Sequence, residues 1–208
     1  MADATKTHVE KELKIGSPLI SCRYEPKGRF IFAGAQDYHM WRWEPATGKK
    51  VQLKGADAWV RAIGFSKDGQ TMLTGGYDGR LLWWTVNGDK SSRAIDAHHG
   101  WIKAVAVSPD GKLIAYVHNE DGSNSLGLVT SGGVVLDHLI SYNDGTQIYG
   151  PRWSSDGKRI LFSLFHGEDR DIAVINAEAT RVPDKIDRFY LDKEREAWEK
   201  AVSYTHLR

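Results

Sequence analysis

The stretch WIKAVAVSPDGKLIAYV, residues 101–117, decides the fold, because two apolar runs flank a single Pro-Asp-Gly turn. Its glycine, Gly111, can adopt the positive φ of a tight hairpin, and the proline presets the first corner. Similar turns carry Gly28, Gly69 and Gly157, so the four glycines are spaced 41, 42 and 46 residues apart. A hairpin repeated at this period indicates an architecture built from internal repeats.

Each repeat has room for three or four short strands. The first strands are predicted at Leu19–Tyr24, Trp59–Phe65, Trp101–Val107 and Tyr149–Trp153. The second strands, after the turns, are predicted at Phe30–Ala33, Thr71–Thr74, Leu113–Val117 and Ile160–Leu164. The third strands are predicted at Met40–Trp43, Leu81–Trp84, Leu126–Val129 and Ile172–Ile175, and weaker fourth strands at Lys50–Leu53, Arg93–Asp96 and Val134–His138. The pattern predicts an all-β fold, a β-propeller of about four blades made of four-stranded antiparallel sheets.

The composition favours a folded protein and identifies no partner by charge. Of the 208 residues, 41% are hydrophobic, which is enough to fill a core. The 28 basic and 27 acidic side chains give a formal net charge of +1, so we expect neither nucleic acid nor a membrane as partner. A lone cysteine, Cys22, cannot form an internal disulfide. The first 14 residues lack the apolar run of a signal peptide, and we expect a cytoplasmic protein.

Two segments carry a recognisable motif. Residues 53–60, LKGADAWV, and residues 97–102, AHHGWI, resemble the opening of a WD40 repeat, in which Gly-His precedes a Trp and the inner strand. Asp37 precedes Trp43 by six residues and Asp78 precedes Trp84 by six, as the Asp of the family precedes its Trp-Asp pair. The resemblance implies a WD40 propeller, which is a non-catalytic scaffold for protein–protein interaction.

The fourth repeat resembles a different propeller family. Residues 151–163, PRWSSDGKRILFS, are similar to the TolB-type repeat, whose core reads Pro-x-Trp-Ser-Pro-Asp-Gly, with Ser155 replacing the second proline. The alternative function is therefore an accessory TolB-like propeller domain of a larger enzyme or envelope complex. The two resemblances cover residues 15–176 and imply one architecture, and their mixture also allows a chimera joined near residues 115–125.

The buried network of the WD40 family is incomplete in every repeat. A histidine, a Ser or Thr, an Asp and the Trp form that network, but the third repeat keeps only His98, with Glu120 at the Asp position by equal spacing. The resemblance implies structural roles for His98, Asp37, Asp78, Trp43, Trp84 and Trp153. Because their family partners are missing, Asp37 and Asp78 must find other hydrogen-bond partners or face water.

Domain boundaries follow from the repeats. We expect an N-terminal segment at 1–14, blades at 15–53, 54–96, 97–138 and 146–190, and a C-terminal helix and tail at 191–208. Four blades are the lower limit for closure, so the chain forms either a small closed ring or a part of a larger propeller. In a closed ring, Thr7 to Leu13 would supply the outer strand of the last blade. The last six residues, SYTHLR, resemble translated adaptor sequence, and we assign them no function.

Catalytic motifs are absent from the sequence. It contains no Gly-x-Ser-x-Gly elbow, phosphate-binding Gly-x-x-x-x-Gly-Lys, His-Glu-x-x-His or Cys-x-x-Cys, so we expect no enzyme and no cofactor. His98, His99 and Asp96 could be drawn as a metal site, but His98 matches the structural histidine of the family, and no metal is predicted. A carbohydrate or metal binder that uses the acidic loops at 119–122 and 168–171 is a third, weaker option.

Partner-binding residues are predicted on one face of the propeller. Trp59 and Trp101 start first strands, and Tyr38 and Tyr77 lie in hairpins that open on the same face by analogy with the family. Tryptophan and tyrosine are common anchors of protein interfaces, although those within strands usually belong to the core. The predicted set for a protein or peptide partner is Trp59, Trp101, Tyr38, Tyr77, Asp57 and His99.

Overall fold

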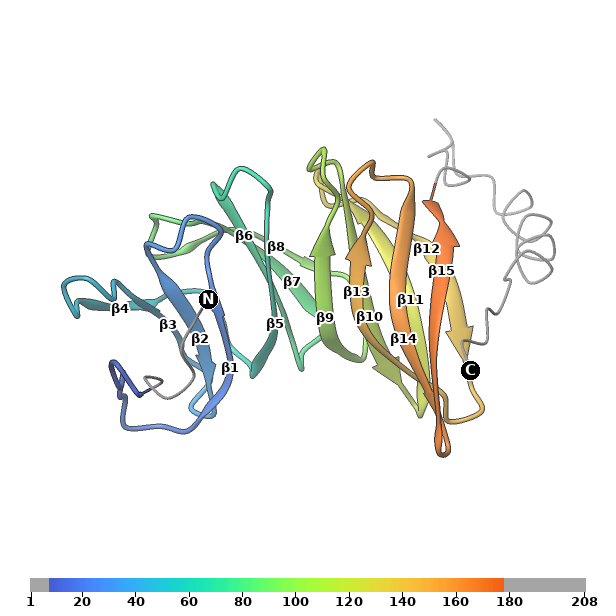
Figure 1. Cartoon of the computed structure of the whole chain (residues 1–208), viewed down its shortest axis with the longest axis horizontal. Helices are drawn as coiled ribbons and strands as arrows, with labels where there is room; N and C mark the ends of the chain where they lie inside the picture. Colours follow the sequence, from blue (N-terminus) through green and yellow to red (C-terminus); the bar gives the residue numbers. More distant parts are fainter. Residues whose placement is uncertain (1–7, 178–208) are drawn as a thin grey trace.

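Four antiparallel sheets make up the computed structural model of this chain, which describes residues 8–177 (Figure 1). The first sheet contains β1 (Leu19–Tyr24), β2 (Ile31–Ala35), β3 (Met40–Trp43) and β4 (Lys50–Leu53). The second contains β5 (Val60–Phe65), β6 (Thr71–Gly76), β7 (Arg80–Thr85) and β8 (Ser91–Asp96). The third contains β9 (Trp101–Val107), β10 (Leu113–Glu120), β11 (Ser123–Thr130) and β12 (Val135–Tyr142). The fourth contains β13 (Gln147–Trp153), β14 (Arg159–His166) and β15 (Asp169–Asn176).

Each sheet is a meander, in which neighbours in the sheet are neighbours in the chain. The turn glycines connect the first and second strands of each sheet and all have positive φ, between +66° and +73°. The predicted strands at Leu19–Tyr24, Lys50–Leu53 and Trp101–Val107 match the observed ones residue for residue. The prediction of an all-β propeller is therefore confirmed.

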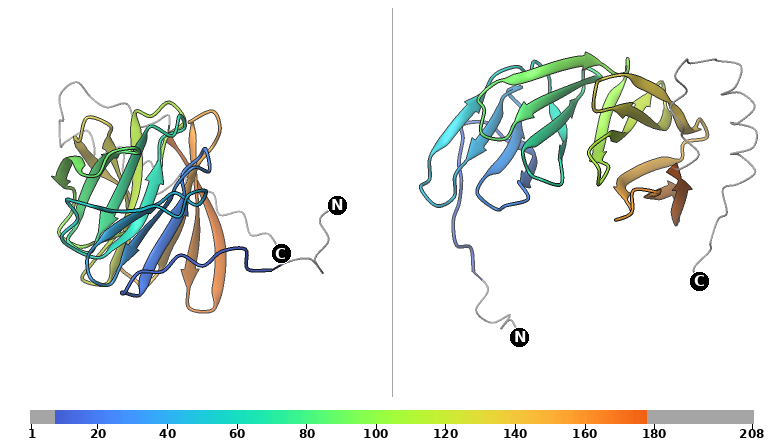
Figure 2. Two further views of the ribbon diagram at one scale, coloured as in Figure 1. Left: turned by 90° about the vertical axis from the view of Figure 1, so that its left-hand side faces the viewer. Right: turned by 90° about the horizontal axis from the view of Figure 1, so that it is seen from above.

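The sheets form an open arc (Figure 2). The first strands of successive sheets, β1, β5, β9 and β13, contact one another along the concave side. Among the described residues, the first and fourth sheets are the two ends of the arc and do not close it into a ring. Of the two arrangements left open by the sequence, residues 8–177 therefore show an open row of blades.

Two expectations about the ends of the chain have different outcomes. The closing strand expected at Thr7 to Leu13 is not formed, because residues 8–13 contain no strand and the fourth sheet has three strands over the described residues. Thr7 itself, the C-terminal helix and the last six residues lie outside the described residues.

The core lies between the sheets, and the middle strands of the second and third sheets are buried on both faces. Phe32, Met40, Met72 and Trp84 belong to the cluster between the first and second sheets. Similar clusters form around Leu73, Ile102 and Tyr116 between the second and third sheets, and around Leu126, Ile160 and Phe162 between the third and fourth. Each sheet therefore buries its apolar surface only against its neighbours, which is the logic of a repeat protein.

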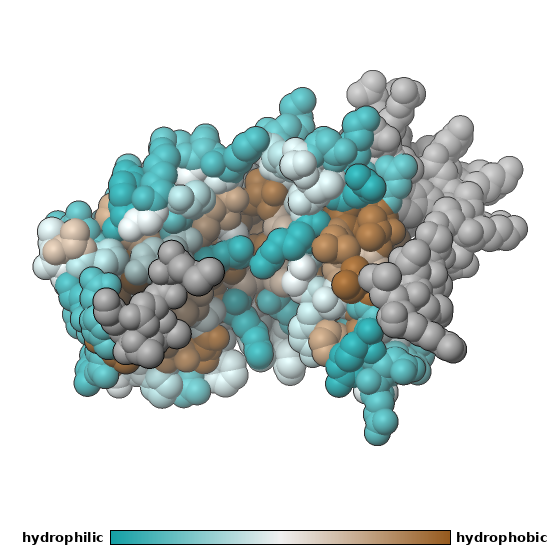
Figure 3. All heavy atoms as spheres, in the orientation of Figure 1, coloured by the Kyte–Doolittle hydropathy of each residue, from teal (hydrophilic) through white to brown (hydrophobic). Residues whose placement is uncertain are grey.

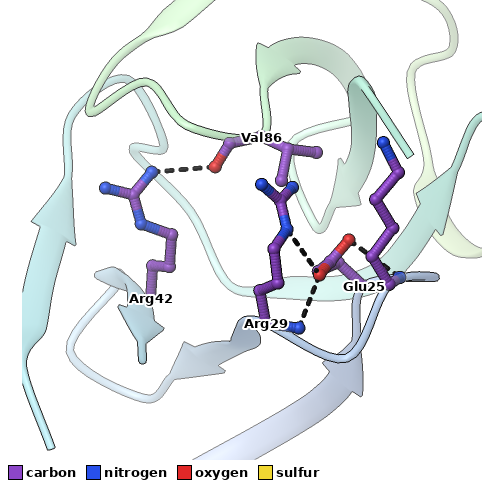
Figure 4. A network of polar contacts seen from close by, with 5 residues as sticks. Glu25, Arg29, Arg42 and Val86 are labelled. Atoms are coloured by element: carbon purple, nitrogen blue, oxygen red, sulfur yellow. Dashed lines mark hydrogen bonds and ion pairs between the residues drawn. The ribbon is translucent and has the colours of Figure 1, made fainter. Parts of the chain in front are cut away.

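A polar network holds the first turn and joins the first two sheets (Figure 4). Glu25 is buried and accepts hydrogen bonds from the backbone amides of Lys27 (3.0 Å) and Arg29 (2.6 Å). Burial raises the pKa of this carboxyl, but these bonds and the Arg29 guanidinium outweigh it and leave the pKa below its usual value. Arg42 of β3 donates to the carbonyl of Val86, at 2.8 Å, in the second sheet.

Candidate partner-binding face

Four aromatic side chains form a continuous row across three sheets. Tyr38 lies in the β2–β3 turn, Trp59 directly before β5, Tyr77 in the β6–β7 turn and Trp101 at the start of β9. Ring centroids of Tyr38 and Trp59 are 6.1 Å apart, those of Trp59 and Tyr77 5.2 Å, and those of Tyr77 and Trp101 4.5 Å. The structure thus brings together all four aromatic residues of the predicted partner-binding set. We call them the aromatic row and their side of the arc the loop face.

The row repeats one contact from sheet to sheet. A hairpin tyrosine of one sheet stacks on the tryptophan that opens the next sheet, and the interplanar angle is 28° both for Tyr38 with Trp59 and for Tyr77 with Trp101. The Tyr77 ring also meets Trp59 edge to face, at 76°. Offset-stacked and edge-to-face arrangements are the favourable geometries for aromatic pairs. The row is therefore an ordered surface, and side chains from different sheets fix one another.

Hydrogen bonds hold the middle of the row. The indole Nε1 of Trp59 donates to the carbonyl of Gln36 in the first sheet, at 2.7 Å. The backbone amide of Tyr77 donates to the Trp59 carbonyl at 3.0 Å, and the Arg61 guanidinium donates to the Tyr77 hydroxyl at 3.2 Å. The two ends of the row remain open to solvent, since Tyr38 is 52% and Trp101 47% exposed.

Tyr38 has a backbone conformation that a bulky side chain rarely adopts. Its φ is +69°, in the left-handed region that favours glycine. The corresponding residue in the second sheet, one position after the hairpin aspartate, is Gly79 with φ +73°. A side chain at Gly79 would collide with the carbonyl of His98, whereas the Tyr38 side chain reaches Trp59 and solvent. The first sheet therefore keeps a tyrosine where the turn itself favours glycine, a strain that is common at functional sites.

Charged side chains flank the row. The side chain of Asp57, 78% exposed, forms an ion pair with Arg80 at 3.2 Å. The same guanidinium lies 4.0 Å from Asp78 and 3.9 Å from Asp96, so three carboxylates surround one cation. His99 is exposed in the loop before Trp101. The predicted Asp57 and His99 thus lie in the loops that lead into the two tryptophans of the row.

The tryptophans predicted to be structural lie inside or between the sheets. Trp84 is 1% exposed, and its Nε1 donates to the Thr74 hydroxyl at 2.9 Å, the remaining part of the network expected from the family. Trp43 is buried at the corresponding position of the first sheet. Trp153 of β13 donates from Nε1 to the carbonyl of Ala106 in β9, at 3.0 Å, and so links the fourth sheet to the third.

The two hairpin aspartates have the substitute partners that their incomplete networks require. One oxygen of Asp37 accepts from the amide of His39, and the other lies 3.3 Å from the His39 ring. Asp78 accepts from the amide of Arg80 at 3.2 Å. Both carboxylates thus stabilise their own turns, as Asp commonly does two residues before a donor.

His98 uses both ring nitrogens in the third repeat. Its Nδ1 accepts from the amide of Gly100 at 2.9 Å, and its Nε2 lies 3.2 Å from the Glu120 carboxylate. A neutral imidazole has one acceptor nitrogen, so this bonding puts the proton on Nε2, which donates to Glu120. Glu120 therefore contacts the same histidine as the family aspartate that it replaces, and both ring nitrogens of His98 are used in structural contacts.

Two further histidines complete a cluster that sequence reasoning missed. His98, His118 and His138 offer nitrogens within 4.8 Å of one another, a spacing that can hold a metal ion. However, the bonds of His98 leave it no free lone pair, and His118 Nε2 lies 2.8 Å from His138 Nδ1. Burial, with His98 and His138 close by, lowers the pKa of His118 to about 3. The bonding of the cluster therefore supports a structural role more than a metal site.

The basic residues around the row were not predicted from the sequence. Arg80 joins the aspartates, and Arg61 contacts Tyr77. A signal for Arg61 was present, because it stands two residues after Trp59 on the same strand and faces the same side by the two-residue period of a strand. No comparable signal exists for Arg80, whose three carboxylates come from the β4–β5 loop, the β6–β7 turn and the end of β8.

The fold defines a class: the chain is a β-propeller, with a row of aromatic side chains on its loop face. None of the described residues belongs to a helix long and apolar enough to cross a membrane. Residues 48–85 and 89–141 match the family described as WD domain, G-beta repeat. The chain therefore contains WD40 repeats, and it has the β-propeller fold.

Relatives and solved structures agree with this assignment. The chain is 33% identical over 81 residues to the small ribosomal subunit protein RACK1y of Oryza sativa subsp. japonica. This match covers 38% of this chain and 24% of the relative. It is 24% identical over 162 residues to protein hir1 of Schizosaccharomyces pombe, covering 67% and 17%. The chain thus spans a quarter or less of the length of these relatives. The Cps50 (Swd1) β-propeller domain of Myceliophteria thermophila superposes with a TM-score of 0.71 at 17% identity, covering 83% of this chain and 55% of that one.

Proposed function

We propose that this chain is a non-catalytic propeller scaffold that binds a protein or peptide partner through its aromatic row. The observation that carries the proposal is the row itself: four aromatic rings from three sheets, in contact by stacking or edge to face, and open to solvent at both ends. A core has no need to place such rings on a loop face. Rigid aromatic side chains are the anchors of most binding hot spots.

The family supports the same function. WD40 propellers are in general non-catalytic scaffolds, and one relative is named as a protein of the small ribosomal subunit, which is itself an assembly. Residues 151–163 form the same kind of hairpin as the other repeats, β13 to β14, so the TolB-like motif builds another blade. No separate site in the described part of the fourth sheet supports the alternative function, an accessory domain of a larger enzyme or envelope complex.

The charges beside the row indicate the chemistry of the partner. Asp57, Asp78 and Asp96 outnumber Arg80, which leaves this flank negatively charged. A cation held over an aromatic face is attracted by the ring, and opposite charges on the flank would steer its approach. The surface suits a segment that presents an apolar side chain next to a Lys or Arg.

The experiment is affinity capture from a native extract followed by titration with the captured partner. The double variant Trp59→Ala/Trp101→Ala should bind it about 30-fold more weakly, since anchors of this kind contribute 2 kcal/mol or more when truncated. The matched control is Lys49→Ala/Asn87→Ala, two exposed residues in turns of the opposite face. Unchanged affinity in a folded Trp59→Ala/Trp101→Ala variant would contradict the proposal.

A further inference from the structure

An open pocket lies at the far ends of the inner strands, away from the aromatic row. It is lined by the ends of β5, β9 and β13 and the turns that follow them, and has a volume of about 320 Å³. The six residues of β5 span about 20 Å, which separates this pocket from Trp59 at the other end of the strand. The volume is at the lower end of the ~300–1,000 Å³ typical of small-ligand sites.

Three cations line the pocket, and none of its lining residues is acidic. They are Arg23 of β1, Arg152 of β13 and Lys67 of the β5–β6 turn. Arg23 and Arg152 come from opposite ends of the arc and meet only through the fold. All three residues keep part of their surface open to solvent and can reach a ligand.

The two guanidiniums have no counter-charge in the described part of the chain. Arg23 donates to the carbonyl of Ile63 at 2.6 Å, and Arg152 to that of Pro151 at 3.1 Å. Partial burial of the Arg23 guanidinium lowers its pKa, and the neighbouring like charge of Arg152 lowers it further. An anion between them would remove this repulsion.

Acids in the adjacent turns are already engaged within those turns. Asp68 accepts from the hydroxyl of Ser66 at 2.6 Å, and Asp110 accepts from that of Ser108 at 2.6 Å. Asp156 makes the same bond with Ser154. Each of the three also accepts a backbone amide of its own turn. Their carboxylate oxygens are therefore held by their own turns, and none of the three lines the pocket.

The basic character continues along the concave side. Arg61 of β5 and Lys103 of β9 add one cation to each of the other two inner strands, and none of the four inner strands contains Asp or Glu. Burial lowers the pKa of Lys103, and the nearby charge of Arg61 lowers it further. Figure 3 shows hydrophilic side chains crossing the middle of this side. The local excess of cations contrasts with a net charge of +1 for the whole chain.

We propose that the pocket binds a phosphate group, held between the guanidiniums of Arg23 and Arg152. Guanidinium forks match the oxygens of phosphate, and such charge-assisted bonds are stronger than neutral ones. Three positive charges are more than a single carboxylate would neutralise, so the pocket suits a doubly charged anion. The group is either inorganic phosphate or the phosphoryl group of a modified peptide, and the site is independent of the aromatic row.

The test is calorimetric titration of the full chain at constant ionic strength with sodium phosphate, a phosphoserine peptide, and the same peptide with glutamate in place of phosphoserine. We expect saturable binding of one or both phosphate probes and weaker binding of the glutamate peptide. Preference for inorganic phosphate would indicate a free anion, and preference for the phosphopeptide a modified protein segment; both support the site. No saturable phosphate binding, or equal binding of the glutamate peptide, would overturn the proposal.

Variants locate the binding. Arg152→Gln should weaken phosphate at least about tenfold, because it loses a charge-assisted hydrogen bond. Its one described side-chain bond goes to the preceding carbonyl, so the fold should persist. Arg23→Gln should act similarly, with folding checked by thermal denaturation. The matched control is Lys112→Gln, an 81% exposed lysine of the β9–β10 turn outside the pocket. An equal loss of phosphate affinity in Lys112→Gln would show that the overall charge causes the effect, and would contradict the site.

Discussion

The tryptophans inside the sheets and those at their edge differ in exposure and in the contacts that they make. Trp84 is fully enclosed, and its indole donates to Thr74. Trp101 is half exposed and stacks on Tyr77 across a sheet boundary. Both belong to strands, β7 and β9. The comparison teaches that the place in the repeat, the third strand or the start of the first, decides whether an indole stabilises the propeller or presents a surface.

The largest expected effect is on stability and separates the two classes directly. Trp84→Ala should lower the free energy of unfolding by about 3–5 kcal/mol, because it leaves a cavity between the first two sheets. Trp101→Ala should cost less, because about half of the indole is already exposed; its stack on Tyr77 contributes about 0.5–1.5 kcal/mol beyond the area that it buries. Chemical denaturation of the two variants beside the wild type measures both. Equal losses would show that the rim tryptophan is also a core residue.

The same comparison can be made with histidines. His118 is buried with a pKa of about 3, whereas an unfolded histidine titrates near 6.5, so the unfolded chain binds the proton first as the pH falls. The stability contributed by neutral His118 is therefore present above pH ~6.5 and lost towards pH 3, by up to about 1.4 kcal/mol per pH unit. Burial also lowers the pKa of His98, which adds to the loss in the same direction.

Denaturation between pH 7 and 4.5 checks this dependence, above the range where most carboxyl groups titrate. His118→Gln should flatten the slope of stability against pH, while the control His99→Gln, exposed on the loop face and only the smallest of the causes that lower the pKa of His98, should change it much less. The slope is the informative quantity, because His118→Gln also changes packing. An identical slope in His118→Gln and the wild type would assign the pH dependence to other groups.

The repeat spacing predicted most of the fold. Strand positions such as Trp101–Val107 follow from local pattern. Trp59 and Trp101 share a repeat position, and Tyr38 and Tyr77 lie in corresponding hairpins that a propeller places on one face. The prediction of a closing strand at Thr7 to Leu13 was wrong, because the spacing of Val9 and Leu13 is a weak signal when no edge strand lies near enough to pair with. The end of the fourth blade and the C-terminal helix stay predictions.

Contacts between sheets were not predictable from the sequence. Arg23 and Arg152 are far apart in the chain, and their meeting depends on how tightly four sheets curve. The left-handed backbone of Tyr38 was hidden because the sequence aligns it with Gly79 only through the aspartates before them. The pairing of His118 with His138 required the register of β10, β11 and β12. Local sequence pattern predicts the strands of each blade, whereas the contacts that form the sites depend on how the sheets pack against one another.

The most direct measurement uses Tyr38→Gly, scored for folding and binding in the same preparation. Glycine relieves the positive φ, worth about 1–2 kcal/mol, but removes the stack on Trp59, worth about 0.5–1.5 kcal/mol, so stability should stay within about 1 kcal/mol of the wild type. Partner affinity should nevertheless fall by tenfold or more, since the open end of the row is lost. Retained stability with weakened binding is the result this account predicts. Wild-type affinity in the folded variant would contradict the claim that the aromatic row is the binding face.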